Sequence, residues 1–547
     1  MDLHPSVADR LTRLAPDQRA AATAPPGPVL CVAPAGSGKT TTLVARIAWL
    51  VASGTARPGE IAAITFNTRA ADEMRERLDP ALEPLGVAAG AVRVRTFHAL
   101  GLEVLRTTGD PLPALVDRES ILRTVWPDAT AAELGRLDTA FSRLKLELQV
   151  EAGAIAGDPD AGPLARAFVA YEAALAEAGA MDFDDLVRRS LRALRESPAL
   201  LADWRARCRH LLVDEVQDVD RSQLDLALLL AAPDDSLFCV GDDDQSIYGW
   251  RLADVRRILD LGDRLPGLSR VDLEVNYRCP SPVVTRAVRL VEHNGERFAK
   301  RIRAGPAATG RLVLAPDAAD ETVRLRRAIG TWPDDGSTRA ILARTNRELL
   351  PAVAVALELG LPFRAPRVEL LLDSPLLDAT LGRAEADARG RPGEPLLLTL
   401  GRLRATSVPG SAEEDLATAL LGWAVGHDAY GAFVAAIRQA RARLAELRRD
   451  DAALTLATAH ATKGLEFDHV VVTGMEAGRF PSARTVAEAD DPSRALEEER
   501  RLAYVAWTRA RRSLTILYDP AIPSPFLLEA FTADELGLNS ASGAPPG

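Results

Sequence analysis

The sequence predicts an α/β protein with parallel sheets, divided into several domains. Its 547 residues exceed what one hydrophobic core organises, so two to four domains are expected. Short apolar runs rich in valine, isoleucine and leucine recur along the chain, as expected of strands buried in a parallel sheet. The first run leads through a glycine-rich loop into a helix-like stretch, and this strand–loop–helix order is typical of α/β domains.

The glycine-rich loop has the pattern of a phosphate-binding motif. The strand-like run GPVLCVA is followed by APAGSGKT, residues 33–40, and then by apolar residues at helical spacing. Gly36 and Gly38 would let backbone amides close around phosphates at a helix N-terminus. Lys39 would reach the β- and γ-phosphates, and Thr40 would hold Mg²⁺. The alternative is a glycine-rich turn without a ligand.

Lysine is rare in this chain. Only four of the 66 basic residues are lysines, at positions 39, 145, 300 and 463. Heavy use of arginine and alanine is typical of a GC-rich genome, so a lysine that persists against this bias indicates a need for a compact point charge. Lys39, inside the phosphate loop, is the clearest example.

Two acidic residues follow the apolar run Leu211–Val213 in RHLLVDEVQDVDRSQ. Asp214 would lie at the carboxyl end of a strand, where its carboxylate suits Mg²⁺ coordination. Glu215 suits orienting or deprotonating the attacking water. Acidic residues after a strand can also simply begin a loop, but the phosphate motif upstream favours the catalytic interpretation.

A third apolar run ends in FCVGDDDQSIYGWRLAD, residues 238–254. Three aspartates and Gln245 are followed at once by Tyr248, Trp250 and Arg251, although aromatic residues make up only 5% of the chain. A Tyr/Trp/Arg cluster after a catalytic strand predicts a surface on which bases stack. The alternative is that these aromatic side chains pack into a domain interface.

Taken in order, these motifs resemble those of a superfamily 1 DNA helicase of the UvrD/Rep type. The resemblance covers nearly the whole chain. Beyond the segments above, it is carried by LAPDQRAAA, ITFNTRAADEMRERL, VRTFHALG, LEVNYRCPSPV, ARTNRE, TAHATKGLEFDHVVV and EEERRLAYVAWTRARRSL. It implies a motor that uses ATP and Mg²⁺ to move 3′ to 5′ along single-stranded DNA.

The resemblance also implies the residues of the ATP site. Gln18 would read adenine, Tyr277 would stack on it, and Arg278 and Arg509 would be arginine fingers, which contribute on the order of 10³–10⁵ in rate. The implied catalytic residues are Lys39, Asp214, Glu215, Gln245, Arg278 and Arg509. The implied ATP-binding residues are Gln18, Ala35, Gly36, Ser37, Gly38, Lys39, Thr40, Thr41, Tyr277, Arg278, Gly464, Glu466 and Arg509. The implied metal ligands are Thr40 and Asp214.

A second set of residues is expected on DNA. Its members are Thr65, Phe66, Asn67, Arg69, Thr96, Phe97, His98, Tyr248, Trp250, Arg251, Arg344, Asn346 and His460. His460 is equally consistent with a hydrogen bond at a domain interface. In AMDFDDLVRRSLRAL, Asp182 is expected to cap a helix whose N-terminal dipole favours Asp184 and Asp185.

The fold that the resemblance implies is two RecA-like P-loop domains with parallel sheets, with a helical insertion in the first and a reduced one in the second. The expected boundaries are 1–100 and 205–270 for the first core, 101–204 for its helical insertion, 271–375 and 452–534 for the second core, 376–451 for the reduced helical insertion, and 535–547 for a disordered tail.

The stretch 376–451 contains one clear amphipathic helix pattern, YGAFVAAIRQARARLAEL, among proline-rich connections. Phe433, Ile437 and Leu444 lie on its apolar face. One helix is too little for an independent core, so it is expected to pack on the second core domain. Relatives carry a larger subdomain here. We therefore expect intact translocation, a weak grip on duplex DNA, and processive unwinding only with a protein partner or self-association.

The composition is that of a soluble globular protein of the reducing cytoplasm. Apolar residues make up 47% and charged residues 26%, and no apolar run reaches the ~18 residues of a membrane helix. The four cysteines contain no CxxC pair, which disfavours a zinc or iron–sulfur site. A net charge of −11 neither indicates nor excludes nucleic acid.

Three hypotheses for the function remain at this point. The first is an ATP-dependent 3′–5′ translocase and DNA helicase that acts on single-stranded DNA and 3′-tailed duplexes in repair, replication or recombination. The second is a DNA-stimulated translocase that displaces proteins without processive unwinding. The third is a motor subunit or recruitment module that depends on a partner. A strand-separation assay beside a protein-displacement assay separates the first two.

Overall fold

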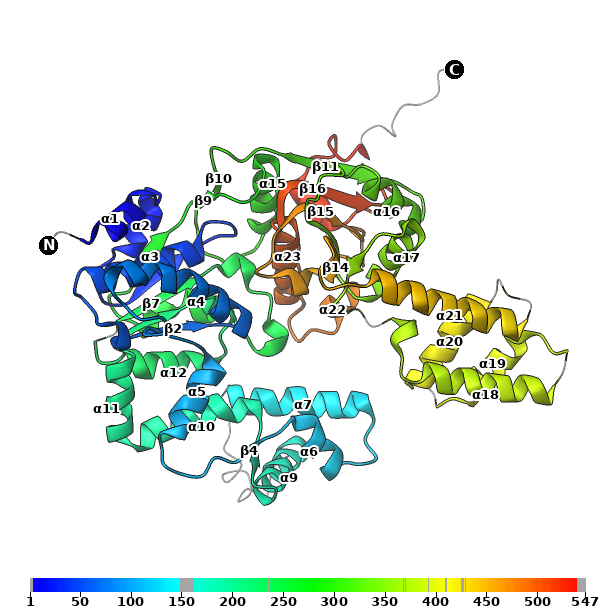
Figure 1. The fold of residues 1–547 in the computed structure, drawn as a ribbon, viewed down its shortest axis with the longest axis horizontal. Helices are drawn as coiled ribbons and strands as arrows, with labels where there is room; N and C mark the ends of the chain where they lie inside the picture. The colour runs from blue at the N-terminus through cyan, green and yellow to red at the C-terminus, as the bar shows by residue number, and fades with distance from the viewer. Residues whose placement is uncertain are drawn as a thin grey trace. The chain divides into compact units, whose positions relative to one another are not determined.

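The computed structural model describes residues 3–147, 162–234, 236–366, 368, 370–391, 393–408, 411–424, 427 and 429–538. The chain forms two compact units (Figure 1). Unit 1 comprises Met1–Arg278 and Val291–Ala308, and unit 2 comprises Cys279–Leu290 and Thr309–Gly547. In the part of the chain that the structure describes, no helix is long and apolar enough to span a membrane.

Unit 1 is built on a six-stranded parallel sheet with strand order β3-β2-β6-β7-β1-β8. The strands are β1 (Val29–Val32), β2 (Ile61–Thr65), β3 (Arg93–Thr96), β6 (His210–Val213), β7 (Leu237–Gly241) and β8 (Ser269–Asp272). Alternate residues of β1 belong to different cores: Val29 and Cys31 to one, Leu30 and Val32 to the other. The sheet is therefore covered on both faces, which explains why inner strands such as β1 and β2 are apolar without alternation, while the edge strands β3 and β8 carry polar residues.

The helices of unit 1 lie on both faces of this sheet and in the insertion. They are α1 (Pro5–Thr12), α2 (Pro16–Ala22), α3 (Lys39–Ala52), α4 (Thr68–Leu82), α5 (Phe97–Arg106), α6 (Arg118–Val125), α7 (Ala131–Leu146), α9 (Pro163–Glu177), α10 (Phe183–Glu196), α11 (Pro198–Arg207), α12 (Arg221–Ala231), α13 (Arg256–Leu259) and α14 (Leu261–Arg264). Helices α6, α7 and α9 enclose a core of their own around Phe141, Phe168 and Tyr171. Two-residue strands β4 (Ala114–Leu115) and β5 (Ala180–Met181) pair at the base of the insertion.

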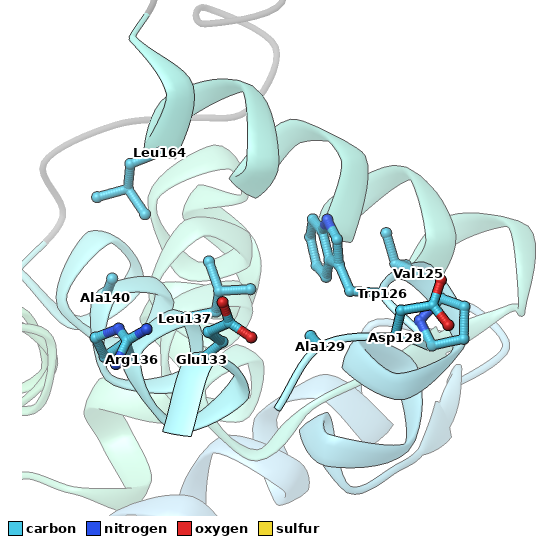
Figure 2. A pocket seen from close by; sticks show the side chains of 10 residues that line it. Val125, Trp126, Asp128, Ala129, Glu133, Arg136, Leu137, Ala140 and Leu164 are labelled. Carbon is cyan, nitrogen blue, oxygen red and sulfur yellow. The ribbon is translucent and has the colours of Figure 1, made fainter. Parts of the chain in front are cut away.

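A surface cavity of about 780 Å³ lies in the helical insertion, between the end of α6, helix α7 and the start of α9. Figure 2 shows Trp126 on one side of this cavity and Leu137 and Leu164 on the other, with the charged groups of Glu133 and Arg136 next to Leu137. Its lining includes no residue that the sequence assigns to a site.

Unit 2 has a second six-stranded parallel sheet, in the order β11-β16-β15-β12-β14-β13. Its strands are β11 (Arg311–Pro316), β12 (Arg339–Ala343), β13 (Phe363–Arg364), β14 (Leu454–Thr458), β15 (Phe467–Val472) and β16 (Ala510–Tyr518). Its helices are α15 (Ser281–Val291), α16 (Glu321–Ile329), α17 (Leu350–Leu359), α18 (Leu377–Gly390), α19 (Leu396–Thr406), α20 (Ala412–Ala424), α21 (Tyr430–Leu447), α22 (Ala483–Ala487), α23 (Pro492–Trp507) and α24 (Pro525–Ala530). The two parallel sheets confirm the predicted α/β class.

The expected boundary between the core domains, at 270/271, falls inside strand β8. This strand pairs with β1 as the sixth strand of the first sheet, and unit 1 continues to Arg278. The chain later returns to unit 1 for residues 291–308, where β10 (Arg303–Ala304) pairs in parallel with β9 (Val275–Asn276). The sequence does not reveal this return, because the pairing involves only two-residue strands.

The second insertion is larger than the sequence indicates. Its described residues form four helices, α18 to α21, where one was expected. Helices α18 to α20 are separated by proline- and glycine-containing connections, so each apolar pattern is too short to read with certainty from the sequence. Phe433, Ile437 and Leu444 are buried as expected, and they belong to the same core cluster as Ile341 and Leu456 of the second sheet.

The predicted disordered tail begins too early. Leu536 is buried, and Glu535 pairs with Arg286 in helix α15. Residues 535–538 are therefore part of unit 2. The remainder of the predicted tail, residues 539–547, lies outside the described residues.

Candidate functional site

The glycine loop joins β1 to α3 at the carboxyl edge of the first sheet. Gly36 and Gly38 have positive φ angles of 68° and 86°, which glycine adopts without steric cost. Larger residues are also excluded by space. A Cβ at Gly36 would lie 2.7 Å from Cβ of Arg278, and one at Gly38 would lie 2.6 Å from Nε2 of Gln18. Lys39 begins α3, so the unpaired first amides of this helix are available to a phosphate.

Gln18 is hydrogen-bonded to the glycine loop. Its Nε2 donates to the carbonyl of Ser37 at 2.7 Å, and its Oε1 accepts from the backbone amide of Ala15 at 3.1 Å. Ser37 is buried, and its hydroxyl has no hydrogen-bond partner among the described residues. A buried hydroxyl without a partner needs one, and a phosphate oxygen in the loop would supply it. Ala35 is buried beside it, while Thr41 is exposed.

Lys39 faces the acidic pair that follows β6. Its Nζ lies 2.7 Å from Oε1 of Glu215, and Oδ1 of Asp214 accepts from the amide of Glu215 at 3.0 Å. Glu215 has a positive φ of 53°, a conformation that costs about 1–3 kcal/mol and occurs preferentially at functional sites. Burial lowers the pKa of Lys39, but attraction by Glu215, Asp214 and Asp242 outweighs it and leaves the pKa raised. The ammonium group therefore stays charged.

A chain of hydrogen bonds joins the acidic pair to the end of β7. Nε2 of Gln217 donates to Glu215 at 2.5 Å, and its Oε1 accepts from the amide of Asp242 at 3.0 Å. Gln245 is buried and donates from Nε2 to Oδ2 of Asp242 at 2.8 Å. Two glutamine side chains thus connect the polar groups at the ends of neighbouring strands.

The segment after β9 packs against the glycine loop. The amide of Tyr277 donates to the carbonyl of Gly36 at 2.9 Å, and the amide of Arg278 donates to Oδ1 of Asn276 at 2.9 Å. The Tyr277 ring is half exposed. The structure therefore brings Gln18, Lys39 and Tyr277 to the same loop within unit 1.

Aromatic side chains lie in a row beside the segment that follows β7. Phe66 and Tyr248 are stacked, with ring centroids 5.1 Å apart and planes 13° apart. Tyr248 meets Trp250 edge-on at 6.2 Å, and the guanidinium carbon of Arg251 lies 4.7 Å from the Trp250 ring centroid. Trp250 is 59% exposed. We call Phe66, Tyr248 and Trp250 the aromatic row. Its rings suit stacking by nucleic-acid bases.

The other residues expected on nucleic acid in unit 1 differ in exposure. Asn67 and Thr96 are the N-caps of α4 and α5, and each side chain accepts a hydrogen bond from the amide three residues on. Arg69 is exposed. Thr65 is fully buried and Phe97 is only 4% exposed, as part of the core beneath the sheet. Core packing accounts for the burial of Phe97, and the Thr65 hydroxyl donates to the carbonyl of Asn67 at 3.1 Å. A contact of either side chain with nucleic acid stays a prediction.

Phe183 is a candidate contact that the sequence reasoning missed. Asp182 caps α10 as expected, but Phe183, the first residue of the helix, is 56% exposed. Its ring lies 6.4 Å from that of His98 in an edge-on arrangement. Burial lowers the pKa of His98; the charge of Asp184 opposes this effect and that of Arg251 adds to it, which leaves the pKa lowered. The sequence signal was only the rarity of aromatic residues, which make up 5% of the chain; the exposure of Phe183 is visible only in the structure.

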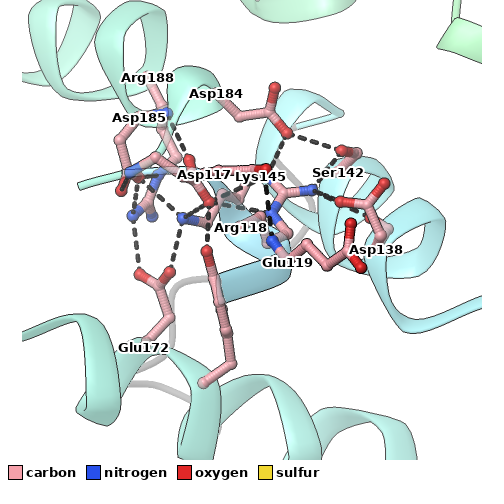
Figure 3. A network of polar contacts seen from close by, with 12 residues as sticks. Asp117, Arg118, Glu119, Asp138, Ser142, Lys145, Glu172, Asp184, Asp185 and Arg188 are labelled. Carbon is pink, nitrogen blue, oxygen red and sulfur yellow. Dashed lines mark hydrogen bonds and ion pairs between the residues drawn. The ribbon is translucent and has the colours of Figure 1, made fainter. Parts of the chain in front are cut away.

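Figure 3 shows a cluster of buried charges around Lys145, at the N-terminus of helix α10, whose first residue is Phe183. Lys145 is fully buried, with Nζ 2.7 Å from Glu172, 2.9 Å from Asp182 and 3.1 Å from Asp185. Asp182 also accepts hydrogen bonds from Arg118 at 2.9 Å and from the Tyr171 hydroxyl at 2.7 Å. We call these residues the Lys145 cluster. They fix the N-terminus of α10, and with it the backbone of Phe183, to helices α6, α7 and α9.

Unit 2 contains the rest of the sequence-predicted residues. Arg344 makes a two-pronged ion pair with Glu499, with Nε at 2.8 Å and Nη2 at 2.5 Å from Oε1. His460 lies near it, and burial together with the charge of Arg344 lowers the pKa of His460 to about 4. His460 is therefore neutral at physiological pH. Asn346 is exposed two residues beyond Arg344.

Arg509 is buried within unit 2. Its Nε donates to the carbonyl of Val505 at 2.8 Å and its Nη1 to that of Leu465 at 3.1 Å. Gly464 and Glu466 flank Leu465, are exposed, and Gly464 has a positive φ of 81°. Arg509 thus fixes the turn that carries Gly464 and Glu466, and its role as an arginine finger stays a prediction.

Two RecA-like parallel sheets, with a glycine loop, a lysine and an acidic pair at the carboxyl edge of the first, define a P-loop nucleoside triphosphatase with a duplicated core. The model of the UvrD/REP helicase N-terminal domain matches residues 14–266, and that of the UvrD-like helicase C-terminal domain matches residues 432–520. The chain therefore belongs to the UvrD-like DNA helicase family.

Similar proteins cover most of the chain. DNA helicase II of Escherichia coli (strain K12) is 30% identical over 92% of this chain and 84% of its own length. ATP-dependent DNA helicase PcrA of Staphylococcus epidermidis is 27% identical over 90% and 81%, respectively. ATP-dependent DNA helicase UvrD2 of Mycobacterium tuberculosis is 32% identical over 91% and 77%.

Proposed function

We propose that the protein is an ATP-dependent DNA helicase that moves 3′ to 5′ along single-stranded DNA and acts in repair, replication or recombination. One observation carries the proposal: within unit 1, a single short segment joins the nucleotide site to the aromatic row. Gln245 donates to Asp242, which Gln217 links to Glu215, and Tyr248 and Trp250 follow Gln245 within the same segment. A change of ATP state at Gln245 can therefore be passed to stacked bases without leaving this segment. The direction of movement is inferred from the family.

ATP would lie on the glycine loop with Mg²⁺. The hydroxyl of Thr40 and the carboxylate of Asp214 are hard oxygen donors of the kind that Mg²⁺ prefers, and the buried Ser37 hydroxyl suits a phosphate oxygen. When bound, the ion would neutralise phosphate charge. Lys39 would exchange its ion pair with Glu215 for the β- and γ-phosphates, which frees Glu215 to orient the attacking water.

Two assays on the full chain test this function. ATP hydrolysis is expected to rise when single-stranded DNA is added, because stacking on the aromatic row would reposition Gln245. Duplexes with a 3′ single-stranded tail are expected to be unwound, and duplexes with a 5′ tail are not. Hydrolysis indifferent to DNA would contradict the motor, and a preference for 5′ tails would contradict the polarity.

The second candidate function is a translocase that displaces proteins. It would unwind duplexes processively only with a partner, or with several copies on one strand. The observation that favours it is the packing of the insertion: Phe433 and Leu444 share one continuous core cluster with Leu456 of the second sheet. An insertion held in this way has little freedom to act on duplex DNA as a separate domain. Single-turnover unwinding with one molecule per substrate tests it, and processive unwinding by a monomer would exclude it.

Trp250→Ala is expected to weaken single-stranded DNA binding by about 1–3 kcal/mol, the contribution of one stacked base. Basal ATP hydrolysis without DNA should change little, since Trp250 is exposed and lies outside the nucleotide loop. Fluorescence anisotropy with a labelled oligonucleotide measures the affinity. Trp250→Phe, which keeps a stacking face, is the matched control. Equal affinities for all three proteins would make Trp250 a packing residue.

Phe183→Ala is likewise expected to lower affinity for single-stranded DNA by about 1–3 kcal/mol. Its ring is 56% exposed and contacts His98 only at an edge, so little packing is lost. The KM for ATP should stay unchanged. Phe183→Tyr keeps the ring and should bind as the wild type does. If removal of the ring leaves the oligonucleotide affinity intact, Phe183 lies outside the DNA path.

A further inference from the structure

Lys300 is the centre of a second buried charge cluster, next to the nucleotide site. Its side chain is 1% exposed, and its Nζ lies 2.7 Å from Asp242, 2.5 Å from Asp243 and 2.9 Å from Asp244. Arg297 adds two hydrogen bonds to the Asp244 carboxylate, at 3.0 and 2.9 Å. We call these five residues the Lys300 cluster.

The geometry explains why lysine stands here in a chain that otherwise prefers arginine. An ammonium group is compact and has three rotatable donors, so it fits among three carboxylates in a small buried space, whereas a guanidinium is a broader planar fork that needs more room. Lys145 has the same surroundings, with three carboxylates within 3.1 Å. Arg297 is used here for a single two-pronged pair.

Asp242 connects Lys300 to the residues predicted to be catalytic. Asp242 uses Oδ1 for Lys300 and Oδ2 for the amide of Gln245, while its own backbone amide donates to Gln217. Gln217 in turn donates to Glu215. One carboxylate therefore shares its two oxygens between Lys300 and Gln245, so a displacement of Lys300 changes the orientation of the Gln245 amide.

The same cluster holds the returning segment 291–308 on unit 1. Besides the pairs of Lys300 and Arg297, the amide of Phe298 donates to Asp243 at 2.8 Å. Both ends of this segment are joined to unit 2: Cys279–Leu290 of unit 2 precedes it, and unit 2 resumes at Thr309 after it. Lys300 and Arg297 thus hold segment 291–308 on Asp242, Asp243 and Asp244, the residues that precede Gln245 and Trp250.

We propose that Lys300 is a positioning residue that couples ATP hydrolysis to single-stranded DNA, by holding Asp242 so that Gln245 and the aromatic row respond together. This inference rests on the proposed helicase function. In the proposed role, Lys300 contacts neither the nucleotide nor DNA, and it acts through Asp242. Burial lowers the pKa of Lys300, but its three carboxylates outweigh burial and raise it, so the group is a permanent cation.

The test compares Lys300→Met with Lys300→Met/Asp243→Asn in the full chain. The first removes the cation, and the second also removes one carboxylate, which restores the net charge of the cluster. Both are expected to lower the kcat of DNA-stimulated ATP hydrolysis at least about tenfold, because one preorganised polar group contributes on the order of 10²–10³ in kcat. The KM for ATP should stay within about threefold, since the glycine loop is untouched.

Each outcome decides between coupling and charge balance. If the double variant regains wild-type stimulation by DNA, Lys300 only neutralises its neighbours and the proposal is overturned. The proposal also fails if Lys300→Met is folded and stimulated normally. Should Lys300→Met not fold, the charge-balanced double variant alone carries the test. Arg301→Met, on the exposed next residue, is the matched control and should behave as wild type. Absence of DNA stimulation in the wild type would instead refute the helicase function.

Discussion

Lys39→Ala is expected to reduce ATP hydrolysis at least about 10²–10³-fold while the protein stays folded. Lys39 begins α3 beside the glycine loop and carries a permanent charge, now paired with Glu215 at 2.7 Å. Without it, no residue of the loop provides a cation for the β- and γ-phosphates. Steady-state hydrolysis with saturating single-stranded DNA measures the effect.

Lys39→Arg is the sharper companion to this experiment. It keeps the positive charge, but a guanidinium is a broad planar fork, whereas the side chain of Lys39 ends in a compact ammonium that is largely buried against Glu215 at 2.7 Å. Both variants should therefore be inactive, with thermal unfolding close to that of the wild type. Substantial DNA-stimulated hydrolysis by folded Lys39→Ala protein would refute the assignment of the nucleotide site.

Lys145→Met is expected to destabilise helix α10 by about 3–5 kcal/mol, the usual cost of removing one partner from a buried ion pair. Glu172, Asp182 and Asp185 would keep their charges around a methionine without a donor. Hydrogen exchange of the α10 amides measures the local opening free energy. Arg143→Met, exposed on the same helix as Lys145, is the control and should change it by less than about 0.5 kcal/mol.

The pH dependence of this effect follows from Asp182. Burial would raise its pKa, but the charges of Lys145 and Arg118 outweigh burial and hold the pKa below its ordinary value. A depressed carboxyl pKa stabilises the fold above the unfolded pKa, and that contribution is lost as the pH falls. The difference between wild type and Lys145→Met should therefore shrink below about pH 4. A difference that grows in acid would contradict the assignment of Lys145 to Asp182.

The sequence predicted the parallel sheets and the glycine loop because both depend on local pattern. A buried parallel strand is apolar throughout, as Val29–Val32 is, and a phosphate loop requires glycines at fixed positions. The apolar face of α21 was found for the same reason, since Phe433, Ile437 and Leu444 recur at helical spacing within one uninterrupted helix.

The features that the sequence could not supply depend on residues far apart in the chain. Lys300 meets Asp242 across 58 positions, and Lys145 meets Asp182 across 37, and neither pairing leaves a local pattern. The exposure of Phe183 follows from where the Lys145 cluster fixes α10. The motif that contains Phe97 predicts a contact of its side chain with nucleic acid. In the structure, tertiary packing buries Phe97 in the core.

The central claim is that ATP hydrolysis drives directional movement along single-stranded DNA. Stopped-flow fluorescence with oligonucleotides of increasing length, labelled at the 5′ or the 3′ end, measures this most directly. For 3′-to-5′ movement, the delay before the protein reaches a 5′ label should grow linearly with length, require ATP and vanish in Lys39→Ala. A signal at the 5′ end that is independent of length, or that persists without ATP, would contradict the motor.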